Sequence, residues 1–338
     1  MSFPWGRTIF SITAVTALLV LRFVSAAPHD GSRGFVKEQR SLMGTLWNIE
    51  VADHGRSDEA RLAIDRAYSE LARIDRLMSE WRPDSPISQV NAAAGQHAVR
   101  VPAELRELLQ RSIHYSEITE GTFDVTWRGM GAIWHFDDQF QVPSASAVAA
   151  ARRNIDYRAI QITGDSIYIP KGVNIGLGGI AKGYAIDRAA QILSKSGFFE
   201  SLIDGGGDVL VSGRPGGRDW RLGIQDPRRE HGEIVGVADV SGMALVTSGD
   251  YERFRIVNGI RYHHIIDPRT GWPANASISV SVMSHSAEEG VVLAKGIFIL
   301  GPTRGLDLAR RAGVEAMLID PQQKQYFTSG FRCAFHAD

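Results

Sequence analysis

The sequence predicts an α+β fold in which mixed, mostly antiparallel sheets pack against helices. Three observations lead to this prediction. Apolar residues recur at helical spacing between residues 57 and 78, and the dipeptides Gly164-Asp165 and Asn258-Gly259 are typical of hairpin turns. Residues 209–283 are rich in short strand patterns. Because strands and helices follow one another in mixed order, this class is favoured over a doubly wound sheet.

Length and composition are those of an ordinary globular protein. The chain has 338 residues, of which 44% are hydrophobic and 22% are charged. One large domain can therefore bury a core, and we expect it to span residues 41–332. The net charge of −1 gives no sign of a nucleic-acid-binding surface. Cys333 is the only cysteine, which excludes an internal disulfide and a cysteine metal site.

The N-terminus has the pattern of a secretory signal peptide. Arg7 precedes an uncharged apolar run that ends at Leu21, and small residues suited to cleavage follow it. The run is short for a membrane span. We expect a signal peptide over residues 1–26, a flexible leader over residues 27–40 and a periplasmic protein. No cysteine lies near the cleavage region, so a lipoprotein is not expected.

Helices are predicted from apolar periodicity and from residues that favour helix starts. The first covers residues 57–78, with Asp58 and Glu59 in the turn where they interact favourably with the helix dipole. Pro102 opens a second helix that continues to Ile118. Further helices are predicted over residues 144–153, from residue 180 to 193, over residues 287–299 and over residues 303–312.

Strand patterns and turns fill the rest of the chain. The first strand is predicted over residues 42–51 with Met43-Gly44-Thr45 inside it, and residues 81–91 are predicted as a loop. Residues 260–266 are predicted as the second strand of the Asn258-Gly259 hairpin. The other predicted strands cover residues 159–169 as a hairpin, 209–211, 220–224, 234–240, 244–247, 253–257, 278–283, 314–319 and 325–328.

The most informative motif lies in residues 173–187, where glycines at positions 176, 178, 179 and 183 lead into a helix. Glycine lets the backbone approach a ligand closely, and a helix N-terminus favours phosphate. Lys182 adds a positive charge there. These features fit a dinucleotide pyrophosphate site. They equally fit a tight strand-to-helix turn with a solvated lysine, which the glycine spacing alone favours.

Six other segments accompany this motif. They are Met43-Gly44-Thr45, Ser79–Ser85, Gly121–Asp124, Ser201–Asp208, Thr247–Tyr251 and His263–Gly271. Together they resemble the ApbE family of FAD:protein FMN transferases, over roughly residues 38–330 and in the family's order. The resemblance implies the ApbE, T-fold-like flavin transferase architecture.

The resemblance also implies that FAD is the ligand. The residues expected to bind it are Met43, Trp81, Thr122, Phe123, Asp124, Gly176, Lys182, Asp204, Asp208, Thr247, Ser248 and Ile265. Trp81 would stack on the flavin or adenine ring, and a cap over the preceding helix is the alternative. The alternative for Asp124, Asp204 and Asp208 is to close turns.

In the family reaction the FAD pyrophosphate is cleaved, FMN is attached to a Thr or Ser hydroxyl of a target protein, and AMP leaves. An imidazole can accept the hydroxyl proton near neutral pH. The family motif has its histidine directly before Ile-Ile-Asp-Pro, which selects His264 as the catalytic base. His263 is expected on the opposite, outer face of the strand. Asp267 is expected to serve a turn rather than to orient His264.

The family also binds a divalent cation, usually magnesium, through a loop carbonyl and an Asp and a Thr on a late helix. The carbonyl here is that of Gly179, but Val291 and Lys295 occupy the Asp and Thr positions. Neither side chain ligates magnesium, so the site is expected to be incomplete. Lys295 would place its ammonium where the cation sits, or transfer would be poor. The less favoured alternative is a Lys295 that extends into solvent.

The resemblance implies an enzyme whose partner is an acceptor flavoprotein of a membrane-associated electron-transfer system. Sodium-pumping quinone reductase and the regulatory flavoprotein of nitrous-oxide respiration are examples of such acceptors. Two alternatives stay open. One is an FAD-binding carrier without efficient transfer, and the other is an FAD pyrophosphatase that releases FMN and AMP. Stable membrane insertion after signal cleavage is not expected.

Overall fold

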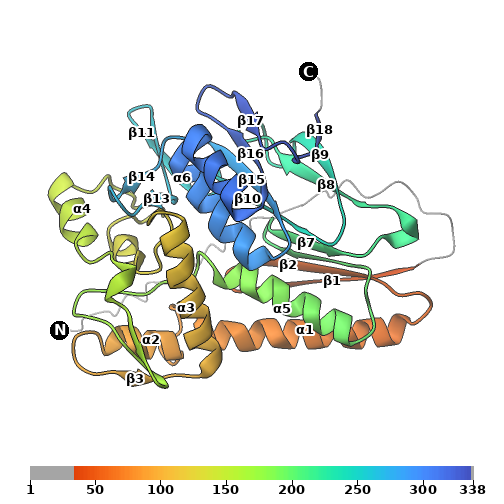
Figure 1. The fold of residues 1–338 in the computed structure, drawn as a ribbon, viewed down its shortest axis with the longest axis horizontal. Coiled ribbons are helices and arrows are strands. Elements are labelled where there is room, and N and C mark those ends of the chain that lie inside the picture. The colour runs from red at the N-terminus through yellow and green to blue at the C-terminus, as the bar shows by residue number, and fades with distance from the viewer. Residues whose placement is uncertain (1–33, 336–338) are drawn as a thin grey trace, which may run out of the picture.

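The structure is a computed structural model that describes residues 34–335. An eight-stranded antiparallel sheet organises this part of the chain (Figure 1). The strand order is β1-β2-β6-β7-β10-β15-β16-β17. The bounds are Phe35–Leu42 for β1, Thr45–Ala52 for β2, Ser201–Gly205 for β6, Val209–Ser212 for β7, Ala244–Gly249 for β10, Ser279–Ser284 for β15, Glu315–Ile319 for β16 and Gln325–Phe327 for β17. All ladders of this sheet are antiparallel, and helices pack against it, which confirms the predicted α+β class.

Smaller sheets surround the main one. One contains β8 (Trp220–Gln225), β9 (Ile234–Val240) and β18 (Ala334–Phe335), and another contains β3 (Val99–Arg100), β4 (Gln161–Thr163) and β5 (Ser166–Tyr168). Two strand pairs are β11 (Phe254–Val257) with β12 (Ile260–His263), and β13 (Ile266–Asp267) with β14 (Trp272–Pro273). Both predicted hairpins are confirmed, because β4 pairs with β5 and β11 pairs with β12 across the expected turns.

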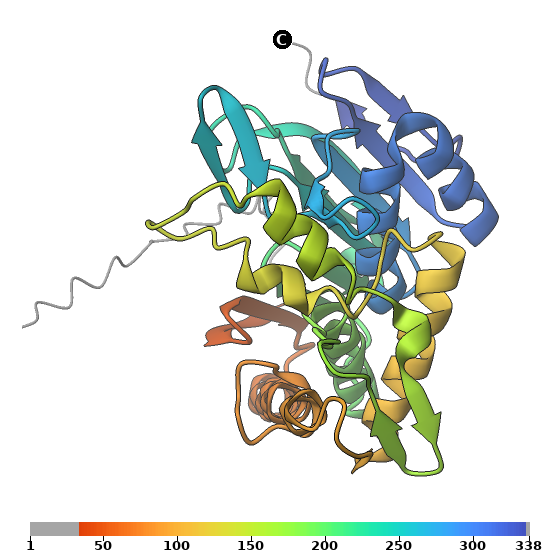
Figure 2. The same cartoon turned by 90° about the vertical axis from the view of Figure 1, so that its left-hand side faces the viewer.

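The helices are α1 (Ser57–Met78), α2 (Pro86–Ala92), α3 (Ala103–Ile118), α4 (Ala145–Arg152), α5 (Ala181–Lys195) and α6 (Ala287–Ala312), with short 3-10 turns η1 (Arg128–Ala132), η2 (Tyr157–Ala159) and η3 (Pro215–Gly217). Helices α1, α5 and α6 lie side by side along the main sheet in Figures 1 and 2. Helix α1 has the predicted bounds and a buried apolar side, although Leu62 of the expected apolar set is exposed. Across residues 34–335, no helix combines the length and apolar character needed to cross a membrane.

Alternation along the strands explains why the main sheet is buried on both faces. In β6, Ile203 belongs to the core under the helices, whereas its neighbour Leu202 packs with the β8–β9–β18 sheet. In β16, Leu318 and Met317 divide in the same way. Successive strand residues point to opposite faces, so a continuous apolar strand supplies two cores. The larger core, between sheet and helices, lies beneath the glycine motif.

The start of the sheet differs from the prediction. The predicted strand over residues 42–51 is broken at Met43 and Gly44, whose positive φ values of 49° and 72° form the turn between β1 and β2. Residues 35–40, predicted as part of a flexible leader, belong to β1. Residues 37–40 of this strand are charged or polar, which fits an edge strand, since edge strands tolerate charged side chains. The predicted signal peptide, residues 1–26, and leader residues 27–33 lie outside the described residues.

Helix α2 occupies part of the segment predicted as a loop, residues 81–91. The Ser85 side chain accepts a hydrogen bond from the Ser88 N–H at 3.1 Å and so caps the helix. Pro86 occupies the first helical position, where its missing N–H costs nothing. Pro86, one of two prolines in the segment predicted as a loop, is therefore a helix-start signal.

Helix α6 consists of two helices that meet at a kink at Gly301, which confirms the two helices predicted over residues 287–299 and 303–312. Gly301 has φ 76° and ψ −172°, a conformation that favours glycine, and Pro302 follows it. A Cβ on Gly301 would also lie only 2.9 Å from the Cβ of Ala276. The kink allows both halves of α6 to pack on the sheet, where the helix contacts β10, β15 and β16.

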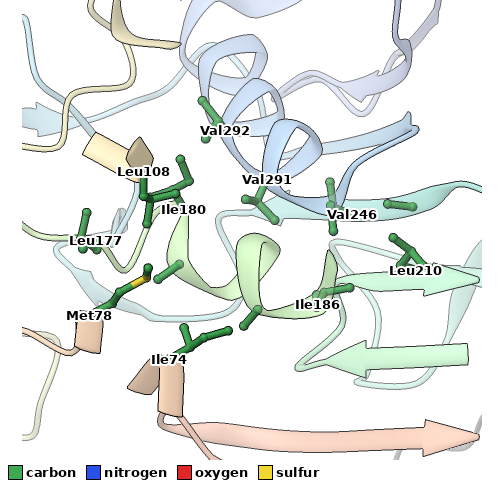
Figure 3. Close-up of a cluster of buried hydrophobic side chains, with 14 of the residues drawn as sticks. Ile74, Met78, Leu108, Leu177, Ile180, Ile186, Leu210, Val246, Val291 and Val292 are labelled. Carbon is green, nitrogen blue, oxygen red and sulfur yellow. The ribbon is translucent and has the colours of Figure 1, made fainter. Parts of the chain in front are cut away.

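Helices α5 and α6 cross in backbone contact at Gly183. A Cβ at this position would lie 2.4 Å from the carbonyl oxygen of Ala287 and 2.7 Å from Cγ2 of Val291, so no side chain fits. Figure 3 shows Val291 pointing from α6 toward α5. The same approach recurs on the other side of α6, where a Cβ on Gly290 would lie 2.5 Å from Ser284 Oγ. Two glycines thus let α6 fit between α5 and the sheet.

Asp187 of α5 fixes the start of α6. Its carboxylate accepts hydrogen bonds from Ser286 Oγ and from the N–H groups of Ala287 and Glu288, at 2.7, 2.8 and 2.9 Å. These are N–H groups that a helix leaves unpaired at its first turn. Burial raises the pKa of Asp187, and the three donors oppose that shift. The register of α6 against α5 is therefore set by a carboxylate cap from the neighbouring helix.

We expect Gly183→Ala to lower the free energy of unfolding by about 1–3 kcal/mol, because overpacking forces the two helices apart. Urea unfolding measures this change. Gly131→Ala is the control, since a Cβ there meets only Trp127 at 3.9 Å. Equal stability of the Gly183 variant and the unaltered protein would show that the α5–α6 contact can relax at no cost.

Candidate functional site

The glycine motif forms a well-anchored loop that ends at α5. Asn91 holds it from α2: its Nδ2 donates to the carbonyl of Ile175 and its Oδ1 accepts from the N–H of Ile175, each at 2.8 Å. Gly176 donates its N–H to the Val125 carbonyl at 2.7 Å. Helix α5 then begins without a side-chain cap. The loop is a tight turn in which the Ala181 N–H donates to the Leu177 carbonyl at 2.8 Å. The N–H groups that follow it in the first turn of α5 are available to a phosphate.

Glu80 packs beside this loop. Its carboxylate lies against the backbone N–H groups of Leu177 and Gly178. Burial raises the pKa of Glu80, while these amides and the nearby Arg128 guanidinium favour its charged form. Sequence reasoning missed this role although Glu80 lies inside the Ser79–Ser85 segment, because its partners are in a distant part of the chain.

Trp81 and Arg128 form a cation–π pair next to Glu80. The Trp81 side chain is 79% exposed, which does not fit a cap over the preceding helix. The Arg128 guanidinium lies over the Trp81 ring, 5.1 Å from its centroid, and Arg128 Nη2 donates to the Glu80 carbonyl at 2.9 Å. Sequence reasoning missed Arg128, and its position four residues after Asp124 is the only signal that could have found it.

Apolar residues of the predicted site lie in or against the main core. The Phe123 ring would approach a Cβ on Gly179 to 3.1 Å, so the loop needs glycine at this close contact. Ile265 is buried in the same core, and Met43 packs against it half-buried. The predicted binding residues Met43, Phe123 and Ile265 therefore share the main core, and Phe123 also contacts the glycine loop.

Thr122 and Asp124 are engaged in the local fold. Thr122 Oγ1 donates to the Thr119 carbonyl at 2.6 Å. Asp124 accepts hydrogen bonds from the N–H and Oγ1 of Thr126 at 2.8 and 2.6 Å, and from the Tyr157 N–H at 3.1 Å. Burial raises the pKa of Asp124, and these donors oppose the shift. For Asp124 the structure therefore favours the turn-closing alternative over a direct contact with a ligand.

Asp204 and Asp208 stand at the β6–β7 connection. Asp204 is buried, and its Oδ1 accepts from the Gly207 N–H at 2.7 Å. Burial raises the pKa of Asp204 to about 7, with Gly207 opposing and the charge of Asp208 adding to the shift. Asp208 Oδ2 lies 3.5 Å from Lys182 Nζ. The structure thus joins Asp208 to the glycine motif, whereas Asp204 mainly closes its own turn.

Thr247 and Ser248 lie together on β10. Thr247 Oγ1 is 2.8 Å from Ser281 Oγ on the neighbouring strand β15, and Ser248 is buried. The next residue, Gly249, is in close contact, since a Cβ there would overlap the Tyr251 ring at 2.2 Å. The Thr247 hydroxyl has a partner within the sheet, so a ligand contact would be additional to that bond.

His264 presents a buried ring nitrogen that has no partner. Its Nδ1 makes no hydrogen bond to any residue that the structure describes, while its backbone N–H donates to the Arg253 carbonyl at 3.0 Å. Burial lowers the pKa of His264 to about 3, and the positive charges of His263, Arg253 and Lys295 lower it further. The imidazole is therefore neutral at pH 7 and can accept a proton.

His263 has a structural role, and the expectation of a surface histidine is wrong. Its ring is buried, its Nε2 donates to the Ala274 carbonyl at 2.7 Å and its Nδ1 accepts from the Ile265 N–H at 3.3 Å. Strand β12 ends at His263, so His264 lies just beyond the strand, whereas the prediction placed it inside a strand over residues 260–266. Asp267 accepts from the N–H and side chain of Arg269 at 2.9 Å, which confirms its use in a turn.

The cation position is filled by residues of this chain. Val291 is 2% exposed against Gly183. Lys295 Nζ donates to the Val291 carbonyl at 2.9 Å, and a Cβ on Gly179 would lie 3.9 Å from Lys295 Cδ. Burial lowers the pKa of Lys295 to about 8, which Asp208 opposes and Lys182 reinforces. The ammonium therefore lies beside the glycine loop and does not extend into solvent.

These residues do not fit magnesium. Neither an apolar side chain nor an ammonium supplies the oxygen ligands that this ion requires. Within residues 34–335, no group of three or more acidic, histidine or cysteine side chains could hold a metal ion. Glu288, one turn before Val291, is occupied by Arg111 through two hydrogen bonds of 2.7 and 2.9 Å.

Comparison with known proteins agrees with the motif pattern. The sequence profile described as the ApbE family matches residues 43–318. This chain belongs to the ApbE family. An FAD:protein FMN transferase from Treponema pallidum is 31% identical over 323 residues, which cover 89% of each chain. One from Klebsiella pneumoniae is 29% identical over 289 residues, which cover 82% of each chain.

Solved ApbE structures share the fold. The ApbE protein of Thermotoga maritima gives a TM-score of 0.80 at 27% identity, over 88% of this chain and 97% of that one. The flavin transferase ApbE of Vibrio cholerae gives a TM-score of 0.77 at 28% identity, over 88% of this chain and 98% of that one. The predicted ApbE architecture is confirmed, and the roles of the individual site residues stay predictions.

We expect Trp81→Ala to weaken FAD binding by about 1 kcal/mol or more, because a ring stacked on the indole loses that contact. Titration calorimetry measures the affinity. Phe199→Ala is the matched control, since Phe199 is also exposed, at 65%, and lies at the other end of α5. An unchanged affinity in the Trp81 variant would show that the indole does not touch the ligand.

Proposed function

We propose that this protein is an FAD:protein FMN transferase that acts on an acceptor flavoprotein. The single observation that supports it best is the neutral imidazole of His264. Its Nδ1 has no partner among the described residues, and Arg253 and Lys295 lie close enough to lower its pKa. Lys295 also packs against Gly179 of the glycine loop, which leads into an uncapped helix start. A base beside an anion-binding loop is the arrangement that attack of a hydroxyl on a pyrophosphate requires.

The transfer balances as a single displacement. The acceptor hydroxyl oxygen attacks the phosphorus of the FMN half of FAD and forms a new P–O bond. The bond between that phosphorus and the bridging oxygen breaks, and AMP leaves with this oxygen. The hydroxyl proton passes to Nδ1 of His264. The depressed pKa keeps His264 unprotonated before the reaction, and the negative pyrophosphate favours the imidazolium once it forms.

Two lysines supply positive charge for the pyrophosphate. Lys182 lies in the first turn of α5, and Lys295 lies beside Gly179 from α6. Together with the helix dipole they favour the negative charge that develops on the phosphate oxygens. We propose that Lys295 takes over part of the charge that magnesium provides in the family, because the side chains at positions 291 and 295 do not bind the ion.

The partner and location follow from the sequence rather than from the fold. The signal-peptide pattern over residues 1–26 supports export to the periplasm. An acceptor in a membrane-associated electron-transfer system would be encountered there. Mass spectrometry after incubation with FAD and a candidate acceptor tests the proposal. Covalent FMN on the acceptor supports transfer, free FMN with AMP supports the pyrophosphatase alternative, and intact FAD supports the carrier.

His264→Ala is expected to lower the transfer rate by roughly 100-fold or more while FAD affinity changes little, because the base acts on the acceptor hydroxyl. Single-turnover transfer and calorimetry measure the two quantities. His114→Ala on the exposed side of α3 is the control. Full transfer by the His264 variant would assign the proton to another group.

Chelation of divalent ions is expected to leave most of the transfer activity in place, since Lys295 cannot be removed as a bound ion can. The double substitution Val291→Asp with Lys295→Thr is expected to introduce magnesium dependence. The measurement is the transfer rate with chelator and with magnesium added back. If the unaltered protein loses all activity on chelation and magnesium restores it, Lys295 is not the substitute, and Glu289 becomes the ligand to test.

A further inference from the structure

Arg128 is the residue at which three predicted flavin-binding segments meet. It follows the Gly121–Asp124 motif in sequence, and its backbone and side-chain stem pack on the glycine loop, where a Cβ on Gly176 would lie 3.0 Å from Arg128 Cβ. Its guanidinium reaches the Ser79–Ser85 segment, where it contacts both Glu80 and Trp81. No other role in the fold accounts for a half-buried arginine at this junction.

The Arg128 guanidinium has N–H donors that make no hydrogen bond within the described part of the protein. Nη2 donates to the Glu80 carbonyl at 2.9 Å, whereas the buried Nε–H has no partner among the described residues. A buried donor without a partner costs free energy of about 1–3 kcal/mol. Nη1 makes no hydrogen bond to a described residue either, so the guanidinium keeps N–H groups free for a ligand acceptor. The fixed Nη2 bond and the Trp81 ring hold the guanidinium plane in place.

The chemistry of this pair fits one end of FAD better than the other. Trp81 offers an exposed aromatic face for a planar ring. A guanidinium donates hydrogen bonds and accepts none. The isoalloxazine ring carries two carbonyl oxygens on its pyrimidine part, while adenine has no carbonyl oxygen and accepts only through ring nitrogens, beside an amino donor. We propose that Arg128, with Trp81, binds the isoalloxazine ring and makes this part of the site selective for flavin over adenine.

This inference rests on FAD as the substrate, and the two halves of FAD provide the test. FMN and ADP both carry phosphate, so loss of the Arg128 charge alone would weaken both alike. Arg128→Met is expected to raise the Kd of FMN by roughly ten-fold or more and to leave the Kd of ADP within about two-fold. Arg128→Lys keeps the charge but not the planar fork, and is expected to resemble the Met variant for FMN. Titration calorimetry measures all four combinations.

Controls separate a binding role from a structural one. Arg152→Met removes another arginine that donates to a backbone carbonyl, that of Arg269 at 2.8 Å, and is expected to change neither affinity. The visible absorption band of bound FMN reports hydrogen bonding to the ring carbonyls, and its shift is expected to disappear in Arg128→Met. If Arg128→Met does not fold, the Lys variant carries the same test.

Three outcomes would overturn the inference. Equal losses for FMN and ADP would mean that Arg128 acts through charge alone, a larger loss for ADP would place adenine at Trp81, and unchanged FMN binding would mean that Arg128 does not touch the ligand. None of these affects the proposed transfer. Failure of the unaltered protein to bind FAD at all would end the proposed function instead, and the two failures are therefore distinguishable.

Discussion

The backbone contact between α5 and α6 at Gly183 is the constraint on which the site depends. It brings the start of α5, with Lys182, and the middle of α6, with Lys295, to the same side of the glycine loop. Asp187 then fixes the register by capping α6 from α5. A shift of α6 by one residue would rotate Lys295 away from Gly179 by about 100°. Packing and capping thus decide which side chain faces the ligand.

The same arrangement explains the electrostatics of the site. Burial lowers the pKa of His264, and the nearby charges of Arg253 and Lys295 lower it further. Burial also lowers the pKa of Lys295. Carboxylates offset this charge: Asp208 interacts with Lys182 and Lys295, and Lys182 and Arg253 favour the charged form of Glu252. A site that buries several positive charges is costly unless they are paired. It is suited to an anion whose charge it compensates, as a pyrophosphate would.

Much of the fold and part of the site could be predicted from the sequence. The helix at 57–78 and both hairpins follow from local patterns that do not need tertiary contacts. The failures occur where distant segments decide the outcome. Residues 37–40 are too polar to indicate a strand, yet they pair with β2 at the sheet edge. Arg128 and Glu80 carry no recognisable pattern, since their partners are brought by the fold.

The histidine pair shows how motif and packing complement each other. The motif alone selected His264, but it could not say what His263 does. The structure answers this, because both His263 nitrogens are used by Ala274 and Ile265. These bonds hold the backbone on either side of His264. A buried, fully bonded neighbour therefore positions the free imidazole without competing for its proton.

In our proposal Lys295 takes the place of a metal ion, which would change what the site can do. A lysine is tethered and needs no supply of metal, but it carries one charge and cannot arrange several oxygens around itself as an octahedral ion does. Its ammonium can also lose its charge by deprotonation. With a pKa of about 8 in the free protein, Lys295 is charged below that pH and loses its charge above it. A bound pyrophosphate favours the charged form, so substrate binding itself would extend the range in which Lys295 assists. Lys295 would therefore be most fully charged once the pyrophosphate is already bound.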